Sequence, residues 1–405
     1  MIRNLDLIIA ICMTLPTYII FFFGTEKITQ GLAFSLYLIP FIIYISMGQL
    51  KKIDNNFIRI WLLFLILWAA PSLYNSFNNT LESDLVALDI LFFHLLLMTS
   101  VVTTFFIFFK INKEKLFQDF LSKVFFILLP LCILIFLKSF YLYLINDDRP
   151  FPFDIHPNVA TEISFLTVIL ATQINRNIIK VPIIFISILT CYFCESRGAL
   201  ISSFLFLLVH YIFPIIKSSN NFNKFSFLYI FLFLIIIFIN FDLIKSILLV
   251  DRHIDNIAGR LPMWKFGYDF FLSHPFSGSG FWVHPMGYSI NYNLSFEEII
   301  SHYTDSEIIL GHSAIVIHNA FLRIAVENGL GLLIIILSFL IIAFYKLIKL
   351  RNFSELAILT GILFFLFFAT RHLTLNLLNI IFYIFILKAM VMPTNKLTNH
   401  NKEKL

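Results

Sequence analysis

Residues 124–145 read VFFILLPLCILIFLKSFYLYLI, with Lys138 as the one charged residue. About 20 helical residues at 1.5 Å each cross a hydrocarbon core, so this stretch predicts a transmembrane helix. The whole chain shares its character: of 405 residues, 59% are hydrophobic and 13% are charged, with a mean hydropathy of +0.89. Soluble domains carry about 25% charged residues, so this composition excludes them.

Similar apolar runs recur along the chain and predict an all-α, polytopic membrane bundle of about 12 transmembrane helices. They cover residues 5–23, 31–50, 60–77, 85–109, 124–145, 159–175, 181–195, 198–216, 225–249, 315–345, 355–370 and 373–391. The first run continues without a small-residue cleavage site, so we expect an uncleaved anchor rather than a signal peptide.

The distribution of charge predicts that both termini are cytoplasmic. With the N-terminus inside, most Lys and Arg residues flank the inner segments, as the positive-inside rule requires. The net charge of +5 does not indicate nucleic acid, because the basic residues lie between spans and form no single face. We therefore expect helices 1–9 within residues 1–250, a long loop on the outer, non-cytoplasmic face over 251–314, helices 10–12 within 315–391 and a cytoplasmic tail over 392–405.

The outer loop is long, and loops of this length are usually functional or disordered. Its many aromatic residues argue against disorder. Leu261, Trp264, Tyr268 and Phe271 recur at helical spacing, which predicts an interfacial helix lying on the membrane. The sequence thus favours a partly helical cap over the bundle.

The cysteines do not indicate a redox or metal centre. Cys12, Cys132, Cys191 and Cys194 all lie in apolar stretches, which predicts packing roles. Cys191 and Cys194 form a CxxC pair, but a zinc site needs a second pair of ligands. The histidines of the outer segments also lack the HxxxH or HxH spacing of a metal site, so no metal is predicted.

Polar residues of three segments converge on the predicted outer face. Arg197 lies in the hairpin Glu195-Ser196-Arg197-Gly198, and Arg260 heads a helix followed by His274-Pro275 and two glycines. The planar guanidinium fork suits a phosphate or diphosphate, although a lone interfacial arginine and plain turn glycines explain these residues as well.

The third segment is His318-Asn319, with Arg323 and Glu327 further along the same span. An imidazole at the membrane edge can take a proton from a hydroxyl near neutral pH, so His318 is the candidate base. Arg323 and Glu327 are spaced to pair on one helix face, and a purely structural ion pair is an equal alternative.

A weaker candidate is the outer segment that contains Asp154 and His156, with Glu162 just inside the next span. These side chains would bind an acceptor sugar or assist proton transfer. Ordinary turn chemistry explains the Asp, Pro and Asn residues of this segment equally well.

These motifs resemble the bacterial O-antigen ligase and O-antigen polymerase family of lipid-linked glycan transferases. The resemblance covers roughly residues 155–335 and depends on the order and spacing of short motifs. They are Ser196-Arg197-Gly198-Ala199, Arg260-x3-Trp264, His274-Pro275-Phe276-x-Gly278-x-Gly280, His318-Asn319-x-Phe321-Leu322 and Glu327-x-Gly329.

The resemblance implies transfer of a glycan from undecaprenyl diphosphate to an acceptor hydroxyl, without a metal, nucleotide or other cofactor. It implies that Arg197 and Arg260 bind the diphosphate and that His318 deprotonates the acceptor. Asn319, Arg323, Glu327, His156 and Asp154 are candidates for support or acceptor binding.

A ligase would transfer the glycan to the lipid A core oligosaccharide, whereas a polymerase would transfer it to another carrier-linked repeat. Polymerases of this group often have two substantial outer loops, and the single long loop here favours the ligase. A transporter or flippase is the alternative from another class. Such proteins are often built from two similar halves, and no second copy of the residue 190–335 pattern is visible in the first half.

Overall fold

Helices make up all the regular secondary structure in the part of the chain that the computed structural model describes. The described residues are 4–23, 27–78, 88–111, 114–145, 157–174, 176–217, 260–280, 319–350, 352–368 and 377–391. The helices are α1 Leu5–Phe23, α2 Lys27–Ser35, α3 Leu38–Ser46, the 3-10 helix η2 Gln49–Lys52, α4 Asn55–Asn78, α5 Leu88–Ile111, α6 Glu114–Ile145, α7 Pro157–Thr172, α8 Asn177–Phe193, α9 Arg197–Lys217, α13 Arg260–Ser273, α17 Ala320–Lys349, α18 Phe353–Phe368 and α19 Leu377–Val391. The predicted all-α class is therefore confirmed.

Several of these helices are long and apolar enough to cross a membrane. By length and composition there are 5 in the described part of the chain, within α1, α4, α5, α6 and α17, and α7, α8, α9, α18 and α19 are shorter apolar helices. The protein is thus a multi-pass helical membrane protein. The predicted span 225–249 lies outside the described residues, and the cytoplasmic placement of both termini stays a prediction.

The predicted span over residues 31–50 is not one helix. The helix is interrupted at Leu36-Tyr37, between α2 and α3, where the Tyr37 N–H donates to the Phe34 carbonyl at 3.0 Å. Pro40 explains the break, because it has no N–H to offer the Leu36 carbonyl four residues before it. The Ile39 N–H takes that carbonyl instead, at 3.2 Å.

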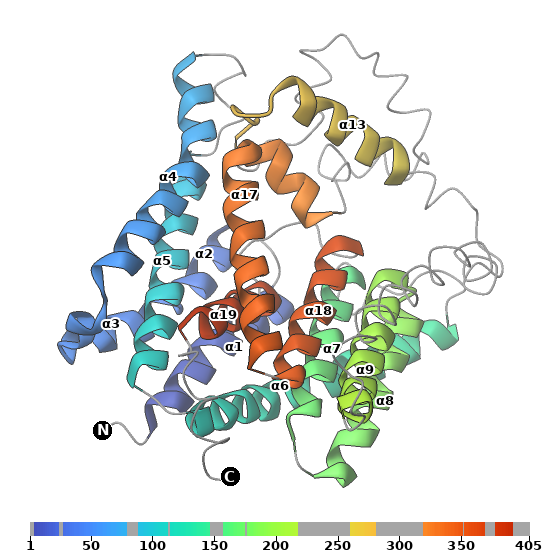
Figure 1. Ribbon diagram of the computed structural model, residues 1–405. Coiled ribbons are helices and arrows are strands. Elements are labelled where there is room, and N and C mark those ends of the chain that lie inside the picture. The colour runs from blue at the N-terminus through green and yellow to red at the C-terminus, as the bar shows by residue number, and fades with distance from the viewer. Residues whose placement is uncertain are drawn as a thin grey trace.

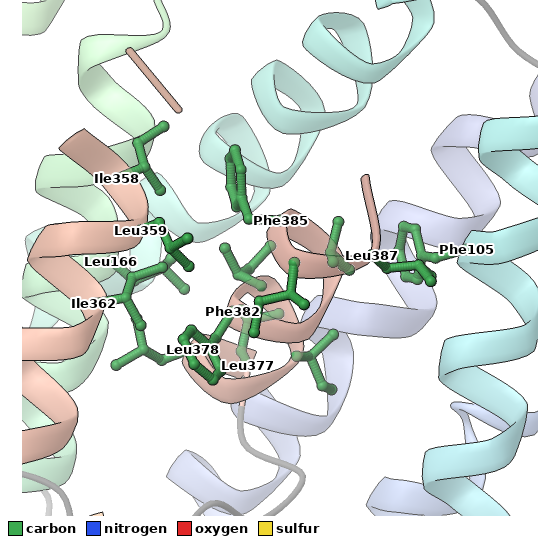
Figure 2. Packing of buried hydrophobic residues seen from close by; sticks show 14 of the residues in the cluster. Phe105, Leu166, Ile358, Leu359, Ile362, Leu377, Leu378, Phe382, Phe385 and Leu387 are labelled. Carbon is green, nitrogen blue, oxygen red and sulfur yellow. The ribbon is translucent and has the colours of Figure 1, made fainter. Parts of the chain in front are cut away.

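The core of the bundle is built around α19, which lies near its middle (Figure 1). Nearly every residue of α19 is buried, as expected of a helix that is hydrophobic on all sides. Figure 2 shows Leu378, Phe382 and Phe385 of α19 among apolar side chains of neighbouring helices. Those neighbours are Phe105 of α5, Leu166 of α7, and Ile358, Leu359 and Ile362 of α18.

The cysteines pack inside the bundle as the sequence predicts, and all four are buried. Cys132 Sγ lies 3.4 Å from Ser187 Oγ, and Cys194 Sγ lies 3.3 Å from Ser139 Oγ. These contacts join α6 to α8 and to the turn after α8, so the thiols serve helix packing.

Candidate functional site

The structure describes part of the predicted site. Arg197 is the first residue of α9 and Arg260 is the first residue of α13, whereas Asn319 immediately precedes α17. His318, His156 and Asp154 lie outside the described residues. The predicted meeting of His318 with the two arginines is therefore not tested, but the segments that carry Arg260 and Asn319 do meet.

The contact lies between the turn after α13 and a bend in α17, and we name residues 274–280 with residues 326–330 the junction. Three backbone hydrogen bonds form it. Ser279 N–H donates to the Val326 carbonyl at 2.9 Å, Gly280 N–H donates to the Glu327 carbonyl at 2.9 Å, and Leu330 N–H donates to the Pro275 carbonyl at 2.6 Å. Two motifs some 50 residues apart in the sequence are thus joined through their backbones.

Gly329 causes the bend, because its φ of 73° and ψ of −176° are not helical. In a continuous helix, the Leu330 N–H would donate to the Val326 carbonyl. Here Leu330 donates to Pro275, and the freed Val326 carbonyl accepts from Ser279. The turn therefore gives new partners to the Leu330 N–H and the Val326 carbonyl, two groups that lose their helical hydrogen bond to each other at the bend.

The two glycines of the junction are required by space as well as by conformation. Gly278 has φ +54°, and a Cβ there would lie 2.5 Å from the Glu327 carbonyl oxygen. Gly329 would place a Cβ 2.8 Å from the Phe276 carbonyl oxygen. Because the opposing atoms belong to the backbone, they cannot move aside as a flexible side chain would.

The first turns of α17, before the bend, are fixed by polar contacts. The Asn319 side chain accepts the N–H groups of Phe321 and Leu322 at 3.1 and 3.0 Å, so it caps the helix. Arg323 Nε and the Glu327 carboxylate form a buried ion pair, which confirms that these residues pair on one helix face. The structure thus gives Asn319 a capping role that its sequence position alone did not indicate.

A further contact ties the bend to α4. Asn328 Nδ2 donates to the Trp68 carbonyl at 2.9 Å, and both residues are buried. The sequence analysis missed Asn328. Its position next to a glycine inside an apolar span was the available signal, because a polar side chain inside a membrane span needs a partner.

Helix α13 packs on α17 and α18 through aromatic side chains. Phe270 is buried against Val326, and the Trp264 and Phe367 rings lie 5.6 Å apart between centroids. Phe270 also stacks on His274 at 4.9 Å. Apolar packing and the junction therefore hold α13 against the end of the bundle (Figure 1).

These features define a multi-pass helical membrane protein in which a helix of the predicted outer loop is joined to a bent span. Residues 182–337 match the family model described as O-antigen ligase, which confirms the resemblance to the O-antigen ligase and polymerase family. The family contains O-antigen ligases and related polymerases, which are membrane glycosyltransferase-like enzymes. The matched region includes α9, α13 and both sides of the junction. A search of curated proteins found no match for the chain.

Substituting either junction glycine is expected to destabilise the protein. Gly278→Ala combines a strained positive φ, which costs about 1–3 kcal/mol, with a backbone clash that adds to it. Equilibrium unfolding of the purified protein in mixed micelles measures the loss. Two further alanine variants separate the effect of the positive φ from that of the clash. Gly48 has φ +66° but no atom within 4 Å of its Cβ position, so Gly48→Ala tests the positive φ alone. Gly31 has open space and no positive φ, so Gly31→Ala tests neither.

We expect Gly31→Ala, inside α2, to leave the unfolding midpoint in place or raise it, because alanine favours a helix over glycine by about 1 kcal/mol. Gly48→Ala should lower the midpoint by the cost of its positive φ alone, and Gly278→Ala should lower it most. Equal midpoints for Gly48→Ala and Gly278→Ala would show that the close approach to Glu327 contributes nothing.

Proposed function

We propose that the protein is an O-antigen ligase of the bacterial inner membrane. It would transfer an O-polysaccharide from undecaprenyl diphosphate to a hydroxyl of the lipid A core oligosaccharide at the periplasmic face. The family match over residues 182–337 supports glycan transfer, because it contains Arg197, Arg260 and His318 in one region, and the single long outer loop favours the ligase over the polymerase. Residues 251–314 would then form the periplasmic part of the site.

The proposed reaction replaces one bond at the anomeric carbon of the donor glycan. His318 takes the proton of the acceptor hydroxyl, whose oxygen bonds to the anomeric carbon. The bond from that carbon to the phosphate oxygen breaks, and undecaprenyl diphosphate leaves. Arg197 and Arg260 stabilise the charge that develops on the diphosphate. No nucleotide is required, because the diphosphate linkage is already activated.

The junction supports this assignment by connecting the segments that carry two of the proposed groups. Arg260 begins α13, whose far end leads into Pro275–Gly280, and His318 adjoins Asn319, which caps the bent part of α17. The backbone bonds from 275–280 to 326–330 fix these helices to each other. Catalytic groups that must meet a substrate in one geometry are best placed on elements held in this way.

The test is lipopolysaccharide gel profiling of a Gram-negative strain from which this gene has been deleted. A ligase predicts bare core on lipid A while carrier-linked polymer accumulates, and the wild-type gene restores the ladder. A core that bears one repeat would assign the protein as the polymerase. An unchanged ladder with normal carrier-linked polymer would contradict both and favour transport or another glycan.

A further inference from the structure

Helix α13 exposes a row of large apolar side chains although it is packed on the bundle. Tyr268 is 53% exposed, Leu272 is 56% exposed and Phe276, in the turn that follows, is 78% exposed. The three residues follow one another at intervals of four. We call them the α13 stripe.

The stripe is one of three sides of α13. Gly267 and Phe270 are buried toward the bundle, whereas Asp269 and Ser273 are exposed and polar. A helix with an apolar flank beside a polar one is typical of segments that lie in the interface of a membrane. The sequence predicted such a helix with Trp264 and Phe271 on its membrane side, but both of these pack against the Phe270 and Val326 cluster.

The contacts of α13 place it at the level where the spans end. Trp264 meets Phe367, which is next to the last residue of α18, and Phe270 meets Val326 just before the bend of α17. Figure 1 shows α13 lying across the ends of these helices rather than beside them. In a membrane protein, this is the depth at which hydrocarbon gives way to headgroups.

The end of the stripe lies beside α17, one face of which has no protein covering in the described part of the chain. The Phe276 carbonyl lies against Gly329, and beyond this residue α17 exposes Ile334, Leu337 and Ile341 at 51%, 41% and 69%. Large apolar side chains along a span normally contact lipid. The exposed apolar face of α17 therefore begins a few residues from the point where the Phe276 backbone meets α17.

We propose that the α13 stripe inserts into the adjoining leaflet of the membrane, where Tyr268, Leu272 and Phe276 contact phospholipid acyl chains. Lipid, rather than a second protein, is the occupant because the stripe adjoins the exposed apolar face of a span at the level of the membrane interface. Tyr268 also fits this placement, because tyrosine is enriched at membrane interfaces. The helix is then held by lipid on one side and by the junction on another, independently of the reaction proposed above.

Fluorescence quenching of the full chain in phosphatidylethanolamine and phosphatidylglycerol vesicles tests the proposal. Single cysteines replace Tyr268, Leu272 or Phe276, with Asp269→Cys and Ser273→Cys as matched controls on the same helix. Each protein is folded before labelling with a bimane thiol reagent, and the unaltered protein measures any labelling of the four native cysteines, which are buried. Lipid brominated in the acyl chains and aqueous iodide serve as the two quenchers.

Bimane at the stripe should lose most of its emission to brominated lipid and little to iodide, and bimane at Asp269 and Ser273 should show the reverse order. Quenching of the stripe by iodide would place it in water and overturn the proposal. Protection from both quenchers would also overturn it, because protein would then cover the stripe. If a label at one stripe position prevents folding, the quenching at the other two stripe positions decides the outcome.

Discussion

Lys388→Met is expected to lower the free energy of unfolding by about 3–5 kcal/mol, the usual effect of removing one partner of a buried ion pair. Lys388 Nζ donates to the Glu355 carboxylate, and both side chains are 3% exposed. The other carboxylate oxygen of Glu355 is buried without a hydrogen-bond partner among the described residues. Without Lys388, the Glu355 charge would have no compensation in an apolar interior. Equilibrium unfolding in mixed micelles measures the loss.

A second substitution separates the effect of the unpaired Glu355 charge from the effect of lost packing. Lys388 Nζ also lies 4.3 Å from the centroid of the Phe117 ring, so Lys388→Met removes a cation–π contact together with the ion pair. If the unpaired Glu355 charge causes most of the destabilisation, Glu355→Gln combined with Lys388→Met should recover much of the stability lost in Lys388→Met. If packing around Phe117 dominates instead, the double variant will be no more stable than Lys388→Met alone.

An exposed ion pair provides the matched control. Lys110 Nζ and Asp54 Oδ2 are 3.2 Å apart, with side chains 39% and 49% exposed. The Phe57 N–H also donates to the Asp54 carboxylate, and this hydrogen bond is the largest single cause that lowers the pKa of Asp54, to which Lys110 adds its own hydrogen bond and charge. Lys110→Met should therefore cost about 0–1 kcal/mol, as is typical of surface pairs.

The sequence predicted the helices themselves well, because span length and hydropathy are local properties. The predicted boundary between residues 195 and 198 agrees with the end of α8 at Phe193 and the start of α9 at Arg197. The break at Tyr37 was missed, although Pro40 signalled it. An apolar run read only for its length gives no weight to a single proline.

The site was predictable as a set of residues but not as an arrangement. Gly278 and Gly329 were identified as parts of separate motifs, and their contact depends on backbone groups whose identity does not vary with sequence. The pairing of Arg323 with Glu327 was predictable because it follows from helical spacing alone. Asn328 was missed because its partner, the Trp68 carbonyl, is far away in the chain.

His318→Ala is expected to reduce the rate of glycan transfer by about 10²–10⁴-fold, the usual contribution of a general base. The rate can be measured directly with the purified protein in vesicles that contain a lipid-linked glycan donor and a lipid A core acceptor. Binding of the donor should change little, so the loss should appear in kcat rather than in KM. If His318→Ala raised KM and left kcat unchanged, His318 would instead be a binding residue.

Arg260→Lys and Arg197→Lys should each reduce the rate by about 10²–10³-fold, because lysine keeps the charge but not the bidentate fork that a diphosphate accepts. Arg176→Lys is the control. Arg176 is exposed at the start of α8, the end predicted to face the cytoplasm, and its substitution should leave transfer unchanged. If Arg176→Lys alone impairs transfer while the other two variants remain active, the predicted sidedness of the bundle is reversed. If all three are active, transition-state charge is neutralised by other groups and the proposed roles of Arg197 and Arg260 are wrong.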